Sequence, residues 1–173
     1  MSVTLQPVRR THAMRLCELY ITNRTFLEPF SPVFDDRFFT ETAHLERIEA
    51  LRRLAREDRT YGYTIDVDGE LAGTLTISDV IRGSFQSAHL GYWVSRHLNG
   101  RGVATLAVRQ AVRMAFDELE LHRLQAATLV RNVASRRVLD KNRFSEIGLA
   151  RGYLRINGRW QDHVLYARVA TGT

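Results

Sequence analysis

The chain has 173 residues, with 25 Lys and Arg side chains against 19 Asp and Glu, and therefore a formal charge of +6. This length suits one domain that buries its own core, and the 45% hydrophobic content excludes a largely disordered chain. No apolar run approaches the roughly 18 residues of a membrane span, the N-terminus lacks the apolar stretch of a signal peptide, and the single cysteine suits a reducing cytosol. We therefore expect a cytoplasmic protein without a membrane partner.

The positive charge lies in the second half of the chain. Residues 1–95 carry 11 basic and 13 acidic side chains, whereas residues 96–173 carry 14 basic and 6 acidic ones. The second half therefore has a net charge of +8, which indicates an anionic ligand or partner there.

Hydrophobic periodicity predicts two helices near the start. A short β-rich opening, residues 3–8, precedes a helix that Thr11 can cap and that runs to about Arg24. The side chains expected on its inward face are Met14, Cys17 and Ile21. Residues 25–39 are rich in phenylalanine and proline and too apolar for a linker, so we expect an ordered aromatic loop. Thr40 then caps a second helix, whose inward face would hold Leu45, Ile48, Leu51 and Leu54.

The middle of the chain is β-rich. Residues 61–67 alternate in polarity, and Asp68-Gly69 predicts a turn into a strand that presents Leu71, Gly73, Leu75 and Ile77 on one face. A third strand is expected over residues 86–95. The remaining expected elements are a helix over 103–119, a strand over 124–130, a helix over 134–141, and two strands separated by Asn157-Gly158. This order shows no linker and predicts a single α+β domain over residues 1–173.

The most informative segment joins the third strand to the helix that follows it. It reads GYWVSRHLNGRGVAT from Gly91 to Thr105, so a Gly-x-Gly turn opens the helix. Glycine permits a positive φ and leaves backbone N–H groups uncovered, which with the helix N-terminus makes a site suited to phosphate. The absence of a third glycine argues against a dinucleotide fingerprint, and the absence of Gly-Lys-Ser/Thr argues against a P-loop. Taken alone, the turn fits equally well a tight turn without a ligand.

Two motifs in this order resemble the GCN5-related N-acetyltransferases (GNAT), and within them the RimJ/RimL-type enzymes that acetylate protein N-termini. The family pattern G-Y-W-[IV]-x4-Q-G-x-G-x-A-T is matched from Gly91 to Thr105, with Asn99 where Gln or Arg is usual. The pattern N-x-x-S-x-x-V-L-x-K-x-G-F is matched from Asn132 to Phe144, with Arg143 in place of the usual glycine. Residues 26–32 and 158–166 also look like this subfamily.

The resemblance implies the GNAT fold, in which helices flank a twisted, mixed, mostly antiparallel sheet of about seven strands that is splayed at the CoA site. It also implies acetyl-CoA as cosubstrate and no metal. The amides of residues 100–105 would hold the pyrophosphate, and the backbone of residues 92–94 would lie along the pantetheine arm. The cofactor-binding residues that it indicates are Tyr92, Trp93, Val94, Asn99, Gly100, Arg101, Gly102, Val103, Ala104, Thr105, Asn132, Ser135 and Lys141.

Acetyl transfer needs a neutral amine, a polarised thioester carbonyl and a proton for the leaving thiolate. An N-terminal amine has a pKa near 8, so roughly a tenth is neutral at pH 7, whereas a lysine amine is neutral about two to three decades less often. A weak base therefore suffices for an N-terminal substrate.

The resemblance also indicates the residues that would move protons. Asp140 stands where many relatives place a tyrosine as proton donor, and Ser135 matches the serine that RimJ/RimL-type enzymes place in this role, although a serine there also fits a plain capping residue. His89 stands where many relatives carry a glutamate base and can accept a proton, but it fits a packed strand residue equally well. Asp162 is the main rival, followed by Glu28 and His163. The histidines show no metal-ligand spacing.

Our leading hypothesis is acetyl-CoA-dependent acetylation of a protein N-terminus, of which a ribosomal protein is the family's typical example. The aromatic loop would form one wall of the acceptor cleft through Phe26, Glu28, Phe30 and Phe34. Two alternatives remain: an acetyltransferase for a small-molecule amine, and a non-catalytic acyl-CoA sensor or RNA-associated module. We expect a monomer or homodimer, and nucleic acid is not the expected partner.

Overall fold

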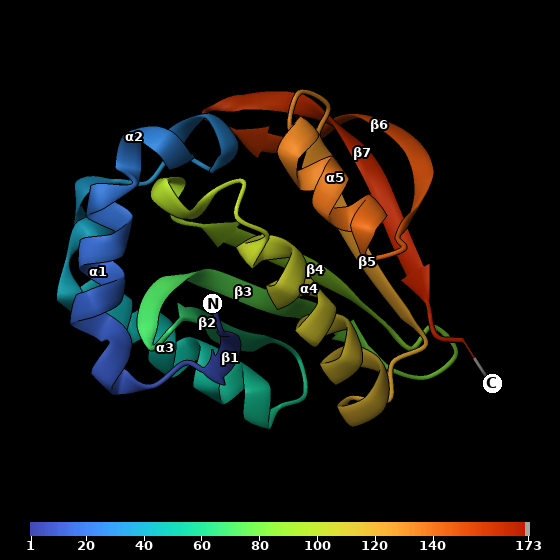
Figure 1. Cartoon of the computed structure of the whole chain (residues 1–173), viewed down its shortest axis with the longest axis horizontal. Coiled ribbons are helices and arrows are strands. Elements are labelled where there is room, and N and C mark those ends of the chain that lie inside the picture. Colours follow the sequence, from blue (N-terminus) through green and yellow to red (C-terminus); the bar gives the residue numbers. More distant parts are fainter. Residues whose placement is uncertain (172–173) are drawn as a thin grey trace.

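One seven-stranded sheet organises the molecule, with strands from both ends of the chain (Figure 1). The computed structural model describes residues 1–171. The strands are β1 (Val3–Pro7), β2 (Tyr61–Val67), β3 (Glu70–Ile81), β4 (Ser87–Val94), β5 (Arg123–Leu129), β6 (Ser145–Ile156) and β7 (Arg159–Val169). Their spatial order is β1-β2-β3-β4-β5-β7-β6, and every neighbouring pair is antiparallel except β4 and β5. The expected α+β architecture, with a mixed and mostly antiparallel sheet, is confirmed.

Helices cover both faces of this sheet. They are α1 (Ala13–Thr22), α2 (Arg24–Leu27), α3 (Glu41–Arg56), α4 (Val103–Arg113) and α5 (Val133–Lys141). Short 3₁₀ turns cover Arg10–His12, Glu28–Phe30, Asp36–Phe39 and Arg96–Leu98, and a π-helical turn covers Met114–Glu118. In Figure 1, α4 and α5 lie on the side that faces the viewer. These two helices pack on the large core cluster around Leu75, whereas α1 and α3 form a second cluster around Ile48.

The second predicted helix has the expected cap. The Thr40 side chain accepts a hydrogen bond from the Ala43 N–H at 3.3 Å, which satisfies one of the free amides of the first turn of α3. Ile48 on its inward face is 1% exposed. Among residues 1–171, no helix is both long and apolar enough to cross a membrane.

The inward face of α1 differs from the expected one. The helix begins at Ala13 after a 3₁₀ turn that contains Thr11, so Thr11 is not its cap. The buried side chains of α1 are Ala13, Leu16, Cys17 and Tyr20, which follow one another at spacings of three, one and three. Met14 and Ile21, expected in the core, are 55% and 52% exposed because they flank this stripe. Of the three predicted inward residues, only Cys17 is confirmed.

A β-bulge changes which side chains face the core at the start of β3. The pairing of β2 with β3 shifts register between Ile65 and Asp66, so Ala72 faces the main core and Leu71 packs with the α1–α3 cluster. Leu75 and Ile77 are fully buried in the main core as expected. The predicted face is therefore wrong for Leu71 alone.

The sheet opens between β4 and β5. The two strands pair in parallel only at Ser87–His89 with Arg123–Gln125. Beyond these positions β4 continues to Val94 and β5 to Leu129 without pairing to each other. The expected splay is confirmed, and it leaves backbone groups of both strands free between the two halves of the sheet.

Arg143 occupies a backbone conformation that favours glycine. It follows the C-cap of α5 with φ of 59°, and a side chain there costs energy because Cβ crowds the carbonyl. Its charge also contributes, after burial, to lowering the pKa of Arg168. We expect Arg143→Gly to raise the free energy of unfolding by about 0.5–1 kcal/mol, measured by urea denaturation. Arg137→Gly, within α5 itself, is the matched control and is expected to lower it by about 1 kcal/mol. Equal effects of the two changes would contradict this explanation.

Candidate active site

The Gly-x-Gly turn forms a cradle of free amides at the start of α4. Gly100 and Gly102 have φ of 78° and 84°, and a Cβ on either would point into open space. Gly102 is the N-cap of α4, and within residues 1–171 the N–H groups of the next three residues, 103–105, have no acceptor. Because these amides and the helix dipole present positive charge to an open surface, the turn is suited to bind phosphate.

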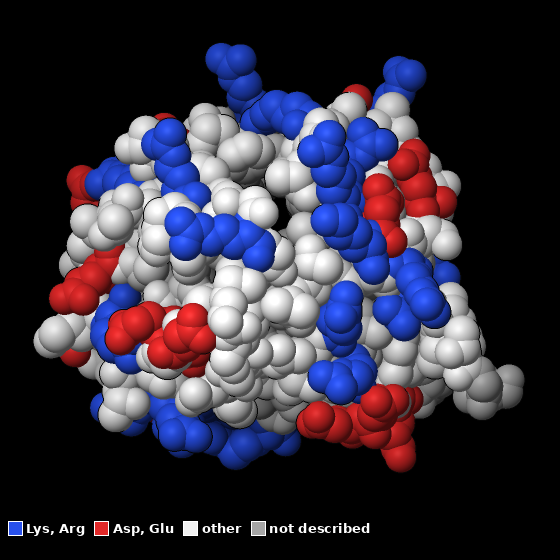
Figure 2. All heavy atoms as spheres, viewed as in Figure 1, with Lys and Arg blue, Asp and Glu red and all other residues white. Residues whose placement is uncertain are grey.

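Basic side chains surround this cradle. Figure 2 shows Lys and Arg on both sides of a hollow in the surface, where Figure 1 places the start of α4 and the length of α5. Arg96 and Arg101 precede α4 and are exposed, and Arg137 and Lys141 of α5 are exposed as well. Arg136 instead donates to the Tyr166 hydroxyl at 3.0 Å and pairs with a neighbouring glutamate. Most of the basic residues in this region thus have charges available for an anionic ligand.

Two hydroxyl groups meet across the splay. The Tyr92 hydroxyl of β4 lies 2.9 Å from Ser135 Oγ of α5, and it also reaches the Ser135 carbonyl at 3.3 Å. Burial raises the pKa of the Tyr92 phenol well above its ordinary value, although the hydrogen bond to Ser135 acts in the opposite direction. Asn132 caps α5 by accepting from the Ser135 N–H at 3.1 Å. The capping contact fixes the backbone of Ser135, and the Tyr92 contact fixes its side chain.

The structure places the other predicted proton-transfer residues elsewhere. His89 lies on β4 at the last position paired with β5, with its Nδ1 3.7 Å from Asp79 and its Nε2 3.5 Å from the Gln125 amide nitrogen. It is three residues from Tyr92, so the two side chains project from opposite faces of the strand. Asp162 is exposed on β7 and accepts from the Gly152 N–H at 2.8 Å, across an irregular part of β6. Within the described residues, neither side chain forms a hydrogen bond or ion pair with Tyr92 or Ser135.

The aromatic segment is ordered, as expected, and borders a cavity of about 180 Å³. Of its predicted acceptor residues, Glu28 and Phe34 line the cavity, together with the β6–β7 turn at Asn157. Phe26 and Phe30 are not among the lining residues, and their rings lie 6.2 Å apart. Asn157 N–H donates to the Ser31 carbonyl at 2.8 Å, which holds the turn against the segment.

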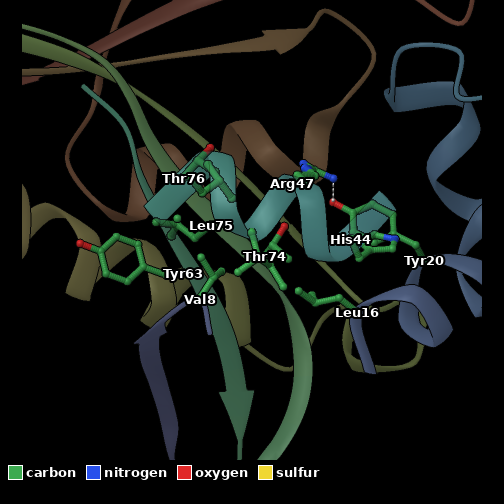
Figure 3. Close-up of a pocket in the computed structure, with 12 residues that line it drawn as sticks. Val8, Leu16, Tyr20, His44, Arg47, Tyr63, Thr74, Leu75 and Thr76 are labelled. Carbon is green, nitrogen blue, oxygen red and sulfur yellow. Dashed lines mark hydrogen bonds between the residues drawn. The ribbon is translucent and has the colours of Figure 1, made fainter. Parts of the chain in front are cut away.

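Tyr20 connects this cavity to β4, which the sequence did not reveal. Its hydroxyl accepts hydrogen bonds from Trp93 Nε1 at 3.0 Å and from Arg47 at 3.3 Å, the second of which is drawn in Figure 3. Its ring lines the cavity and packs against His44 and Phe38. The sequence feature that points to this role is the four-residue spacing of Tyr20 from Leu16, which places both side chains on one face of α1.

His44 is buried beneath Tyr20 and couples folding to pH. Figure 3 shows its ring beside that of Tyr20; it is 2% exposed, and its Nε2 has no partner among residues 1–171. Burial, and secondarily Arg47, lower its pKa to about 4. Between about pH 6.5 and 4 the unfolded chain binds a proton that the folded chain does not, so acidification lowers the free energy of unfolding, by up to about 3 kcal/mol from this group.

We therefore expect His44→Phe to weaken the loss of stability on acidification. The free energy of unfolding is measured by urea denaturation at about pH 7 and about pH 4.5. His12, whose pKa is also lowered by burial, remains and keeps a part of the dependence. An unchanged difference between the two pH values in the variant would contradict the assignment to His44.

Within residues 1–171, no group of three or more His, Cys, Asp or Glu side chains is arranged to hold a metal ion. The polar groups that the fold brings together are instead amides, arginines and hydroxyls. This donor set suits an anionic ligand held by hydrogen bonds.

Known proteins resemble this chain over most of its length. Residues 2–145 match the family described as the acetyltransferase (GNAT) domain. The probable N-acetyltransferase YjcK of Bacillus subtilis is 37% identical over 168 residues, which cover 96% of this chain and 93% of that protein. The [ribosomal protein uS5]-alanine N-acetyltransferase of Escherichia coli is 32% identical over 165 residues, covering 92% of this chain and 85% of that protein.

A solved structure extends the similarity to three dimensions. RimJ of Mycobacterium smegmatis, in complex with CoA-disulfide, superposes with a TM-score of 0.94. The two sequences are 36% identical, and the match covers 97% of this chain and 82% of that one.

Proposed function

The chain belongs to the acetyltransferase (GNAT) domain family, and from this premise we propose that it transfers the acetyl group of acetyl-CoA to the α-amine at the N-terminus of a protein. The observation that carries the proposal is the splay between β4 and β5, which has a phosphate cradle and a hydroxyl pair on one side. A cavity of about 180 Å³ is lined by Tyr20, whose hydroxyl accepts a hydrogen bond from Trp93 of β4. The similarity to the [ribosomal protein uS5]-alanine N-acetyltransferase of E. coli supports the choice of a protein as acceptor. We further propose that residues 1–173 form one such domain, since β1 and β7 belong to the same sheet.

The cradle fits the phosphates of CoA. The free amides of residues 103–105 would bind the pyrophosphate, supported by Arg101 and the exposed basic side chains of α5. The unpaired edge of β4 up to Val94 offers backbone groups to an extended pantetheine arm. Asn132 uses its carbonyl oxygen to cap α5, so its NH₂ group is left to donate to the same arm. When bound, acetyl-CoA supplies an activated acetyl group whose carbonyl carbon bonds to the acceptor nitrogen as the thiol leaves.

Ser135 would give its proton to the leaving thiolate. Tyr92 keeps its own proton at neutral pH, because an ordinary tyrosine pKa is near 10 and burial raises that of Tyr92 further. It therefore acts as a hydrogen-bond donor rather than as a base. Either hydroxyl can donate in the 2.9 Å contact, and Tyr92 can instead donate to the Ser135 carbonyl. When Tyr92 donates to Ser135 Oγ, the Ser135 proton is free to point into the splay, and Tyr92 stabilises the oxygen after that proton has gone. We assign Ser135 as the catalytic residue and Tyr92 as its positioning residue.

The acceptor amine needs little help to lose its proton. About a tenth of N-terminal amines are neutral at pH 7, so water relayed to a weak base is sufficient. His89 remains our first choice for that base, because its side chain is half-exposed at the last position where β4 and β5 pair, next to the splay. Asp162 is the less suitable choice because its carboxylate already accepts from the Gly152 N–H.

The proposal is tested by release of free thiol from acetyl-CoA in the presence of two acceptor panels. The first panel contains peptides that begin with Ala, Ser or Thr, and the second contains polyamines and aminoglycosides. We expect turnover with the peptides. Turnover with the small amines alone would replace the proposal by a small-molecule acetyltransferase, and CoA binding without turnover on either panel would indicate a sensor.

A further inference from the structure

The cavity beside the aromatic segment has a chemical character of its own. Its lining combines the aromatic residues Tyr20, Phe34 and Phe39 with charged and polar residues, and its volume is about 180 Å³. It lies between α1, the aromatic segment and the β6–β7 turn, whose Asn157 closes one side. A space of this size can hold one long side chain but not a whole peptide segment.

One charge in this cavity is uncommitted. Arg24 also lines it, but its guanidinium pairs with Asp36 at 3.2 Å and lies over the Phe39 ring at 4.3 Å. Asp35 accepts from the Phe38 N–H at 3.0 Å and caps a 3₁₀ turn. Glu28, in contrast, is exposed, lines the cavity together with Tyr20, Phe34 and Phe39, and has no ion pair or hydrogen-bond donor for its carboxylate within residues 1–171. A carboxylate and aromatic rings in one cavity can recognise a cation, through an ion pair and cation–π contacts.

We propose that this cavity binds a cationic side chain of the acceptor, from a residue that closely follows the acetylated N-terminus, with Glu28 as its counter-charge. The proposal rests on the proposed function, because it takes the acceptor to be a peptide chain. It names the substrate class as N-termini that carry arginine or lysine among their first residues.

The position of the cavity supports a residue close to the reacting amine. Tyr20 lines the cavity and accepts from Trp93, and Trp93 directly precedes Val94 at the open end of β4. The cavity is therefore one side chain away from the strand that borders the reaction centre. An extended peptide advances by about 3.3–3.6 Å per residue, so a side chain within the first few positions is at the right distance to enter it.

The experiment measures kcat/KM for peptides that differ at one position only. Each peptide begins with alanine and carries arginine, its neutral isostere citrulline, or glutamate at position 2, 3 or 4. For the position that enters the cavity, we expect arginine to be preferred over glutamate by about 10-fold or more. Glu28→Gln is expected to reduce this preference to about 3-fold or less, and Glu28→Arg to reverse it.

Glu18→Gln provides a matched control. Glu18 is an exposed glutamate of the neighbouring helix α1, outside the cavity lining, so this change removes the same charge and should leave the preference intact. An absence of preference at every position would overturn the proposal. So would a Glu28→Gln variant that loses activity equally on all peptides, since Glu28 would then bind the α-amine itself.

Binding of the acetylated product peptides separates this proposal from the proposed function. Calorimetric titration of the enzyme with N-acetylated Ala-Arg and Ala-Glu peptides needs no turnover. Tighter binding of the arginine peptide, weakened by Glu28→Gln, with no peptide acetylated, would support the cavity and refute the transfer activity. Acetylation of all peptides with equal product affinities would refute the cavity and leave the transfer activity in place.

Discussion

Gly102→Glu is expected to weaken acetyl-CoA binding by about 100-fold or more, which is about 2.7 kcal/mol. The change puts a carboxylate at the N-cap of α4, where the free amides of residues 103–105 would otherwise meet a phosphate. A Cβ at Gly102 meets nothing within 4 Å, so the glutamate side chain would occupy the open space that a phosphate would otherwise enter. Its negative charge would also repel the phosphate. Calorimetric titration with CoA measures the effect.

Gly69→Glu is the control for backbone strain. Gly69 has φ of 88°, close to the 84° of Gly102, and also has open space around its missing Cβ, but it lies in the β2–β3 turn. Both variants are therefore expected to lose similar stability, whereas only Gly102→Glu should lose CoA. CoA affinity that falls equally in both variants, or in neither, would contradict the cradle.

Ser135→Ala is expected to lower kcat by about 100-fold while changing the dissociation constant of acetyl-CoA by less than about 3-fold. The hydroxyl would be needed only when the thiolate leaves, so its loss affects turnover more than binding. The cap of α5 survives the change, because Asn132 accepts from the backbone N–H of Ser135 and not from its side chain. Unchanged turnover would remove Ser135 from the mechanism.

Tyr92→Phe tests whether the pair acts together. It removes the hydroxyl 2.9 Å from Ser135 Oγ and keeps the ring, so we expect a smaller loss of kcat, about 10-fold, with little change in KM. In the Ser135→Ala background the same change should have almost no further effect, because Tyr92 acts through Ser135. Tyr61→Phe, which removes a hydroxyl bonded to Asp58 at 2.7 Å, is the matched control and should leave kcat unchanged.

The cradle could be predicted from the sequence because its requirements are local. A Gly-x-Gly turn between a strand and a helix needs positive φ at both glycines, and the structure has both. The hairpin at Asn157-Gly158 was predictable for the same reason, with φ of 46° and 74°. In these segments the residue type and the backbone conformation are linked directly.

The contacts that assemble the site depend on distances along the chain that no local pattern encodes. The Tyr92–Ser135 pair joins residues 43 positions apart, and the Tyr20–Trp93 hydrogen bond joins residues 73 apart. The Tyr92–Ser135 contact depends on how far β4 separates from β5. The Tyr20–Trp93 contact depends on which face of α1 turns inward. That face was mispredicted at Met14 and Ile21, because a 3₁₀ turn precedes the helix and the apolar stripe alone did not show its orientation. The aromatic segment was predictable as ordered, but its cavity was not.

The most direct test of the central claim locates the acetyl group on a product. The enzyme and acetyl-CoA are incubated with a peptide that has a free N-terminal alanine and an internal lysine, and the product is fragmented in a mass spectrometer. We predict one added acetyl group, on the fragment that contains the N-terminal residue. Acetylation of the lysine with a free N-terminus, or no acetylated peptide at all, would contradict the claim.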